Sequence, residues 1–329
     1  MFTQPLPSQP ANAANQPAPK APAQRFAPFG SVANPFFARG QQARDLPNLW
    51  VVLVVALVLA ILTALPSQLL RPLFQSFYAL AETGLPSRSA SVQTVQHLLN
   101  YAPLFVLLAL WLRWVERRPF WTLGFPAGSI VRQAGRGLLV GCLLYLVPVA
   151  LAALLGHVTW EEGPAAQQGL AALGGIWIAL IGWLVQGAAE ETLTRGWLLQ
   201  VIGLRYRPWL GVLVASLFFS LLHALNPQFN TIAALNLALF GLFTALYVLR
   251  AGNLWGVAAL HAAANWTQGN LISVPISGRP GAGGTLLNLA IGGPDWLGGG
   301  KFGPEGGLLM TLTLLVGTLL LFCWPRRLA

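Results

Sequence analysis

Long runs of apolar residues, separated by short polar or basic stretches, make up most of the chain from about residue 48 onwards. A transmembrane helix needs about 20 mostly apolar residues, and roughly 17 to 25 are tolerated. By this criterion the pattern predicts an all-α fold: a polytopic membrane protein built as a bundle of about eight transmembrane helices. The predicted spans are 48–65, 95–114, 135–156, 172–203, 209–225, 230–249, 254–270 and 306–324.

Composition and charge agree with a membrane protein. Hydrophobic residues make up 55% of the 329 positions and charged residues 9%, whereas a soluble domain has about 25% charged residues. The net charge of +10 comes mainly from arginines between apolar segments. Basic residues in such loops are typically retained beside the negative cytoplasmic face of a membrane. We therefore expect the lipid bilayer as the surroundings and no nucleic acid as a partner.

Two segments lack the apolar pattern. Residues 1–45 are rich in Pro, Ala and Gln and cannot bury enough apolar surface to offset the entropy of ordering. They predict a disordered cytoplasmic tail, followed by a transmembrane domain at 46–329. The Gly-rich stretch 278–307 lies between the last two predicted spans. It predicts a compact outer loop, and a lid over the outer mouth of the bundle is the alternative.

The distribution of basic residues predicts the orientation. With a cytoplasmic N-terminus and eight spans, the inner side holds 15 of the 19 Lys and Arg residues. This satisfies the positive-inside rule and predicts that both termini are cytoplasmic. The basic residues left on the outer side are Arg71, Arg88, Arg279 and Lys301.

Three ionisable residues stand inside the predicted span 172–203, namely Glu190, Glu191 and Arg195. Charged groups at membrane depth are costly, so they indicate a functional site. Glu191 and Arg195 are four residues apart and share a helix face, which predicts a buried, mutually neutralising pair. Glu190 has no basic residue three or four positions later. It therefore remains available as a general base.

Two later spans supply further polar residues. His261 and Asn265 share a helix face because they are four residues apart, and the same spacing puts the Phe219 ring one turn from the His223 imidazole. At about 1.5 Å per residue from the nearest inner-side arginine, the polar positions lie roughly 16 to 24 Å from the inner face. The residues at this common depth are Glu190, His223, His261 and Asn265. His97 and His157 lie near predicted helix ends and are expected at the membrane interface.

This set of residues permits two chemistries. In the first, Glu190 and His223 activate water for attack on a peptide carbonyl, and His261 with Asn265 stabilises the oxyanion. In the second, Glu190, His223 and His261 ligate a zinc ion that keeps an open position for water. The residues alone leave both open. No H-E-x-x-H sequence, the zinc-binding motif of many metalloproteases, is present.

Three short motifs carry a family resemblance. EETLTR at 190–195, FSLLH at 219–223 and HAAAN at 261–265 resemble the EExxxR, FxxxH and HxxxN motifs of the CAAX-protease and bacteriocin-processing (CPBP, or Abi) family. The resemblance covers about 120–285. It implies an eight-helix bundle and an intramembrane endopeptidase, labelled a metalloprotease. It also implies that Glu190 and His223 activate water and that His261 and Asn265 stabilise the oxyanion. Glu191 and Arg195 are supporting motif residues.

We therefore predict an intramembrane endopeptidase that hydrolyses a peptide bond of a membrane-associated protein or peptide. The resemblance suggests the cytoplasmic membrane of a bacterium. A non-catalytic scaffold or bacteriocin-immunity protein is one alternative, in which Glu190 would be dispensable. A Glu/His proton relay or transporter is the other. It predicts an internal repeat, and none is visible in the sequence.

Overall fold

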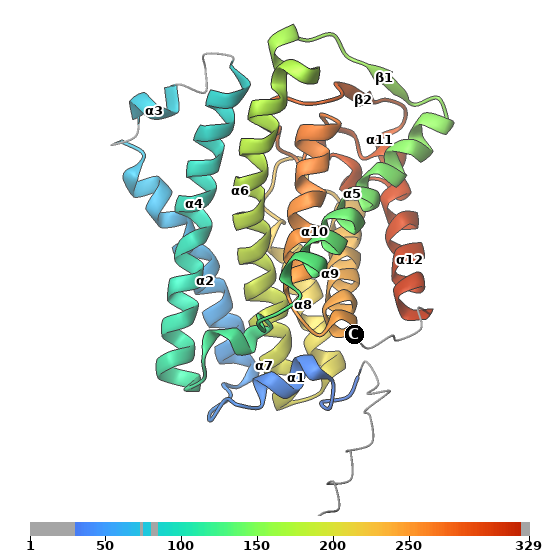
Figure 1. The fold of residues 1–329 in the computed structure, drawn as a ribbon. Coiled ribbons are helices and arrows are strands. Elements are labelled where there is room, and N and C mark those ends of the chain that lie inside the picture. Colours follow the sequence, from blue (N-terminus) through green and yellow to red (C-terminus); the bar gives the residue numbers. More distant parts are fainter. Residues whose placement is uncertain (1–29, 73–74, 80–84, 324–329) are drawn as a thin grey trace, which may run out of the picture.

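A computed structural model describes residues 30–72, 75–79 and 85–323, and these residues are mostly helical (Figure 1). A helix lies at each of the eight positions that the apolar pattern predicted. These main helices are α2 (Leu49–Leu70), α4 (Pro86–Trp111), α5 (Ile130–Leu154), α6 (Leu173–Glu191), α8 (Pro208–Leu222), α9 (Thr231–Ala251), α10 (Trp255–Trp266) and α12 (Leu308–Cys323). The short helices are α1 (Pro35–Gly40), α3 (Gln75–Ala79), α7 (Gln200–Arg205) and α11 (Asp295–Gly298).

Five helical segments in the described part of the chain are long and apolar enough to cross a membrane. They are Leu49–Leu70, Pro86–Glu116, Ile130–Leu154, Gly169–Arg205 and Thr231–Ala251. The helices α8 and α12 are apolar but shorter. The 12-residue helix α10 is buried on nearly all sides within the bundle and continues directly into the π-helix η7 (Thr267–Leu271). The protein is therefore a mostly helical integral membrane protein.

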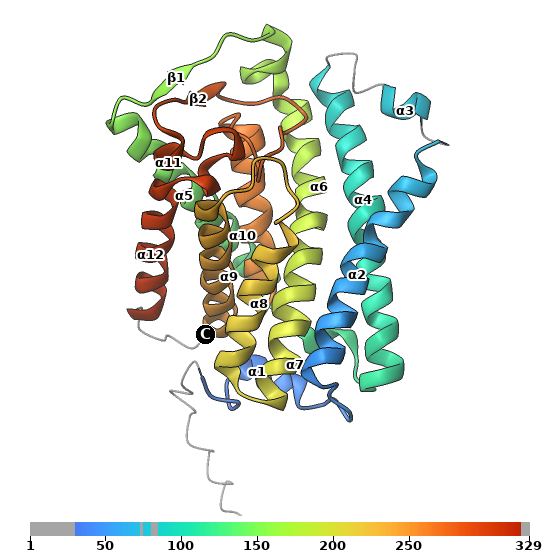
Figure 2. The same cartoon turned by 180° about the vertical axis from the view of Figure 1, so that it is seen from behind.

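The bundle is organised around α10. This helix packs mainly against α5 and α6, while α4 pairs with α6, α8 with α9, and α9 with α12. In both views α2 and α4 form one side of the bundle and α12 the opposite side (Figures 1 and 2). Glycine allows the closest contact: a Cβ on Gly137 of α5 would lie 1.9 Å from the Gly256 carbonyl oxygen of α10. Such small residues let membrane helices approach closely.

The end of the bundle that carries α1 is held by a polar cluster. The Gln200 side chain donates to the carbonyl oxygens of Phe36 and Thr122, at 2.9 and 3.0 Å. Arg118 donates to Gln200 and, at 2.7 Å, to Glu116. Because these contacts join α7 to segments more than 75 residues away in sequence, they fix the ends of the helices relative to one another.

Ordered structure begins earlier than the sequence indicated. We predicted disorder for 1–45, and residues 1–29 lie outside the described residues. Helix α1, however, starts after Asn34, whose side chain caps it and also donates to the Leu249 carbonyl oxygen at 2.9 Å. Phe36 and Phe37 are fully buried. Burial of two aromatic rings outweighs the Pro-rich composition nearby, so the described domain extends at least to residue 34.

The connections at the other end of the bundle are structured. A two-stranded antiparallel ribbon, which the sequence did not predict, joins β1 (Val158–Trp160) to β2 (Leu289–Ile291), with Thr159 opposite Ala290. The Gly-rich segment 278–307 contains β2, α11 and the 3-10 turns η8 (Gly300–Phe302) and η9 (Pro304–Gly306). Phe302 and Glu305 are buried. The predicted compact loop is thus present, and it packs into the end of the bundle.

Candidate active site

Glu190 lies near the end of α6 and faces a cavity between the helices. Its Oε1 accepts a hydrogen bond from Gln186 Nε2 at 2.8 Å. Its Oε2 is 3.8 Å from Nε2 of His261 and has no hydrogen-bond partner among the described residues. Only 15% of the side chain is exposed. One carboxylate oxygen is therefore fixed, and the other is available for a proton.

Glu191 and Arg195 form the contact that their spacing predicted. Arg195 Nη1 lies 3.1 Å from Glu191 Oε1, and both side chains are fully buried. The guanidinium also lies over the Phe219 ring, 4.5 Å from its centroid, in a cation–π contact. The same Glu191 oxygen is 2.8 Å from Nδ1 of His261. Glu191 thus joins the arginine to the histidine, a link that the sequence did not indicate.

The helix widens immediately after the two glutamates. Residues Thr192–Leu199 form a π-helix, η6, between α6 and α7, and such wide turns are frequent at functional sites. The hydroxyls of Thr192 and Thr194 donate to the carbonyl oxygens of Ala188 and Glu190, each at 2.6 Å. These bonds satisfy backbone carbonyls where the helical pattern changes. The two threonines of the motif therefore support the backbone that carries the glutamates.

His261 and Asn265 both face the cavity from α10, as their spacing predicted. Asn265 Nδ2 donates to Gln186 Oε1 at 2.8 Å, and Gln186 in turn donates to Glu190. Gln186 therefore bridges the first motif and the last. The sequence analysis missed this residue, although a glutamine four positions before Glu190 in an apolar helix is a signal that could have identified it.

His223 directly follows α8, as its C-cap residue, and lines another side of the cavity. Its Nδ1 is 2.9 Å from the Phe219 carbonyl oxygen, and the two rings are 4.7 Å apart, which confirms the predicted aromatic contact. Phe219 and Phe240 lie 5.8 and 5.2 Å from the His261 ring. Two aromatic side chains thus pack against the histidine rings.

The cavity that contains Glu190, called the Glu190 cavity below, has a volume of about 480 Å³. It brings together the four residues predicted at a common depth, whereas Glu191 and Arg195 lie behind its wall. His97, which we expected at the membrane interface, lines it as well, with its ring 4.7 Å from that of Trp183. The sequence had named Arg279 only as a basic residue of the outer side, and it had not singled out the other polar residues that line the cavity. Together these are Thr63, Gln93, Gln96, Asn100, Tyr101, Tyr145, Gln186, Asn226, Ser277, Arg279 and Glu305.

Glu305 shows that the Gly-rich segment contributes to this cavity. Its Oε1 accepts from Gln268 Nε2 at 3.2 Å and from Ser277 Oγ at 3.1 Å. Its Oε2 is buried and lacks a hydrogen-bond partner in the described part of the chain. Desolvation by burial raises the pKa of Glu305 to about 7, and the hydrogen bonds oppose this only in part. The loop therefore brings a second acid to the cavity.

The residues do not form a preassembled metal site. Glu190, His223 and His261 line one cavity, but no group of three or more His, Cys, Asp or Glu side chains in the described residues is arranged to hold a metal ion. The Nδ1 atom of each histidine already contacts a protein oxygen. These contacts leave Nε2 of each histidine as the atom that could ligate a metal, as is usual for zinc-bound histidines, and the mechanism proposed below uses only protein groups and water.

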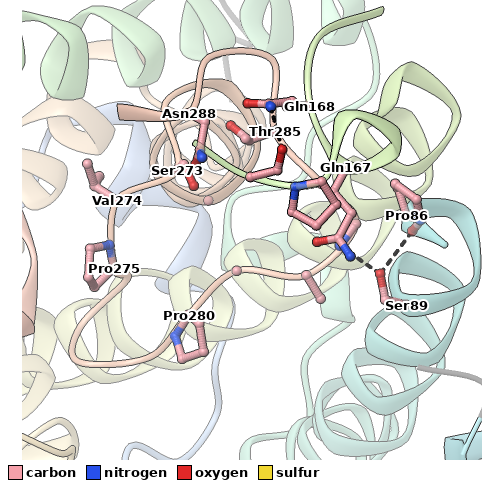
Figure 3. Close-up of a pocket in the computed structure, with 17 residues that line it drawn as sticks. Pro86, Ser89, Gln167, Gln168, Ser273, Val274, Pro275, Pro280, Thr285 and Asn288 are labelled. Carbon is pink, nitrogen blue, oxygen red and sulfur yellow. Dashed lines mark hydrogen bonds between the residues drawn. The ribbon is translucent and has the colours of Figure 1, made fainter. Parts of the chain in front are cut away.

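A second cavity of about 460 Å³, called the loop cavity, lies between the start of α4 and the Gly-rich segment (Figure 3). Figure 3 shows small polar side chains around it, among them Ser89, Ser273 and Thr285. No charged side chain lines this cavity within the described residues. Pro280 lines both cavities, so the two lie next to each other.

Comparison with known proteins agrees with the motifs. The family model for the type II CAAX prenyl endopeptidase Rce1-like proteins matches residues 172–267. This segment extends from the start of α6 to the end of α10 and contains all three motifs. The match confirms the resemblance that the motifs indicated. No curated protein and no solved structure matches the chain.

Proposed function

Because residues 172–267 match the family model of the type II CAAX prenyl endopeptidase Rce1-like proteins, we propose that this protein is an intramembrane endopeptidase. It would hydrolyse a peptide bond of a membrane-associated protein or peptide. The observation that carries the proposal is the convergence of Glu190, His223, His261 and Asn265 on one buried cavity, with Glu190 Oε2 left unpartnered among the described residues.

In the proposed mechanism, water is held between Glu190 and His223. The Phe219 carbonyl can only accept, so Nδ1 of His223 carries the hydrogen in that contact, and Nε2 is the atom that can accept a hydrogen bond from water. Glu190 Oε2 takes the proton as the water oxygen attacks the peptide carbonyl carbon. When the C–N bond breaks, Glu190 returns this proton to the leaving nitrogen. The products are a carboxylic acid and an amine.

His261 and Asn265 would stabilise the oxyanion. A carboxylate can only accept, so Nδ1 of His261 donates to Glu191. Nε2 can then hold a second proton and donate it to the developing charge. Asn265 uses one amide hydrogen for Gln186 and has another available. If both donate to the same oxygen, they form the two-donor arrangement that stabilises the oxyanion in acyl-transfer chemistry.

His261 lies between the two carboxyl groups of the first motif. Its Nδ1 is 2.8 Å from Glu191 and its Nε2 is 3.8 Å from Glu190, while Arg195 pairs with Glu191 from the other side. An imidazolium formed there during the reaction would be compensated by the neighbouring carboxylates, which offsets the cost of a charge in a buried site.

The membrane setting is part of the proposal. We propose eight crossings with both termini in the cytoplasm, in the cytoplasmic membrane of a bacterium, with a substrate delivered at the membrane. Helix α1 and the end of α12 lie at the same end of the bundle (Figure 1), which supports an even number of crossings. Zinc participation stays a prediction, and metal analysis of the purified, active protein measures it directly.

The test is cleavage by purified, detergent-solubilised protein of a peptide library, with wild type compared with Glu190→Gln. This change keeps the size of the side chain and its contact with Gln186 but removes the base. We expect a rate loss of about 100-fold or more, the usual contribution of general base catalysis. Glu161→Gln, at an exposed glutamate, is the matched control and should leave the rate unchanged.

The outcomes separate the candidate functions. Equal cleavage by wild type and Glu190→Gln, both folded, would remove Glu190 from the mechanism. Absence of cleavage by both, together with an unchanged cellular phenotype for the Glu190→Gln variant, would instead favour a non-catalytic scaffold. Proton flux through the wild type reconstituted in vesicles, lost in the variant, would indicate a relay.

A further inference from the structure

We propose that Arg279 is a specificity-determining residue that pairs with a carboxylate of the peptide substrate at the exposed edge of the Glu190 cavity. This inference rests on the endopeptidase function proposed above. It adds a substrate class to that function, namely peptides that carry an acidic group at a fixed distance from the bond that is cleaved.

The first reason is the charge that Arg279 brings to the cavity. It is the only Lys or Arg among the described residues that line the Glu190 cavity. The residue is exposed, and it forms no ion pair with any described residue. Tyr101 and Glu190 line the same cavity. Arg279 is therefore a cation directed at the same space as the proposed base.

The second reason is the rigid backbone that holds Arg279. Ile276 and Arg279 exchange both backbone hydrogen bonds, at 2.7 and 3.0 Å. The two residues between them, Ser277 and Gly278, have φ values of 46° and 82°. Positive φ at both central positions is typical of a type I′ turn, the tight connection of a two-residue hairpin. The side chain therefore extends from a fixed point, which reduces the entropy lost on binding.

Three contacts hold this turn in place. Asn226 Nδ2 donates to the Ser277 carbonyl oxygen at 3.1 Å, and Ser277 Oγ donates to Glu305 at 3.1 Å. The Gly278 amide donates to the Phe302 carbonyl oxygen at 2.8 Å. A Cβ on Gly278 would lie 2.0 Å from the Pro227 carbonyl oxygen, so only glycine fits. The surroundings thus determine where Arg279 stands.

The third reason is its place between two cavities. Arg279 lines the Glu190 cavity, and the next residue, Pro280, lines both that cavity and the loop cavity shown in Figure 3. On the opposite wall, Ser89 of α4 lines the loop cavity, while Gln93, one turn later, lines the Glu190 cavity. An extended peptide lying in both cavities would pass between α4 and the turn that carries Arg279.

Electrostatics then favours one position for an acidic group. The ionised Glu190 repels a substrate carboxylate that enters the cavity, since like charges in a partly dehydrated site interact strongly. Arg279 is the only Lys or Arg on the described wall of this cavity, and a guanidinium matches a carboxylate with two parallel hydrogen bonds. Acidic groups are therefore accepted beside Arg279 and rejected near Glu190. The carboxylate could belong to an Asp or Glu side chain or to a free C-terminus.

The test uses pools of fluorogenic peptides that differ only in charge. One pool carries Asp and Glu at the varied positions, a second Asn and Gln, and a third Lys. Each is made with a free C-terminal acid and with a C-terminal amide. Cleavage is measured for full-length wild type, Arg279→Gln and Arg279→Glu. Binding of the same pools, by fluorescence anisotropy, is measured with Glu190→Gln and with the double variant Glu190→Gln/Arg279→Gln.

For wild type we expect kcat/KM about tenfold higher on peptides with the carboxylate than on neutral ones, mainly through KM; tenfold corresponds to about 1.4 kcal/mol. Arg279→Gln should abolish the preference, and Arg279→Glu should transfer it to Lys peptides. Arg88→Gln removes an exposed arginine that lines neither cavity and should retain the preference. Loss of the preference on C-terminal amidation assigns the terminal carboxylate; loss on replacing Asp and Glu assigns the side chain.

Other results would overturn the inference. A wild type that cleaves all pools equally, or an Arg279→Gln variant that loses rate on every pool in the same proportion, assigns no recognition role to Arg279. The binding assay separates the two proposals. Charge-dependent binding without cleavage would contradict the endopeptidase function but keep Arg279 as the carboxylate site. Cleavage without charge preference would contradict only the role of Arg279. If neither cleavage nor charge-dependent binding is detected, both proposals are contradicted.

Discussion

The buried acid of the Gly-rich segment predicts a specific dependence of stability on pH. Glu305 is 3% exposed, and the Gln268 and Ser277 side chains that donate to it are neutral. No described Lys or Arg forms an ion pair with it. Ionisation therefore places a charge in a buried site without a cation nearby. This is the physical reason why its pKa is raised from 4.5 to about 7.

The magnitude follows from the two pKa values. Each pH unit of difference corresponds to about 1.4 kcal/mol, so raising the pKa from 4.5 to about 7 makes ionisation in the folded protein costlier by about 3 kcal/mol. Between these pH values the folded state binds more protons than the unfolded state, so stability falls as pH rises. The loss is complete above pH 7 and absent below pH 4.5.

The perturbation is Glu305→Gln, which keeps an acceptor oxygen for Gln268 and Ser277 but cannot ionise. At pH 5 the variant and the wild type should unfold at similar temperatures. At pH 8 the variant should be more stable by up to about 3 kcal/mol, or about 5 °C for a chain of this size. Thermal unfolding in detergent, followed by tryptophan fluorescence from pH 5 to 9, measures the difference.

The control is Glu162→Gln, which removes a carboxylate from an exposed position. Its unfolding temperature should follow that of the wild type at every pH. If Glu305→Gln also follows the wild type from pH 5 to 9, ionisation of Glu305 is not linked to folding and the reasoning is refuted. If the variant is less stable at every pH by the same amount, the hydrogen bonds of Glu305 matter and its charge does not.

Two further predictions concern packing and the buried ion pair, both measured by thermal unfolding in detergent. Gly137→Ala should destabilise the protein by about 1–3 kcal/mol, because the new methyl group overpacks against the Gly256 carbonyl. The control is Gly135→Ala, where a Cβ meets nothing within 4 Å, and it should be neutral or slightly stabilising. Equal effects of the two changes would contradict the close crossing of α5 and α10. Arg195→Met should lower the free energy of unfolding by about 3–5 kcal/mol, because it removes the guanidinium that pairs with Glu191. Adding Glu191→Gln should recover most of this stability. A double variant no more stable than Arg195→Met would show that the two residues do not act as a pair.

The sequence predicted the parts of the fold and the site that depend on local spacing. The length of each apolar run indicated the helices, since a helix across a membrane requires that length. The spacing of four residues predicted the contact between Glu191 and Arg195 and the ring contact between Phe219 and His223. These features follow from helix geometry alone.

Long-range contacts could not be predicted in this way. Glu191 meets His261 across 70 residues of sequence, and no periodic pattern connects them. The Gly-rich segment has no periodicity, so the arrival of Arg279 and Glu305 at the Glu190 cavity depends on turns that only the folded chain specifies. The exception is α1, where two adjacent phenylalanines in a Pro-rich stretch were a visible signal of burial.

The π-helix after the glutamates makes the chain length of this region as important as its residues. Before η6 in the chain, Glu190 faces the cavity. After η6, Gln200 holds the polar cluster at the end of the bundle that carries α1. Deleting one residue within 192–199 would shift the phase between these two parts by about 100°, the rotation per residue of an α-helix. The segment thus acts as a spacer with a fixed number of residues. We expect it to tolerate substitutions better than the insertion or deletion of a single residue.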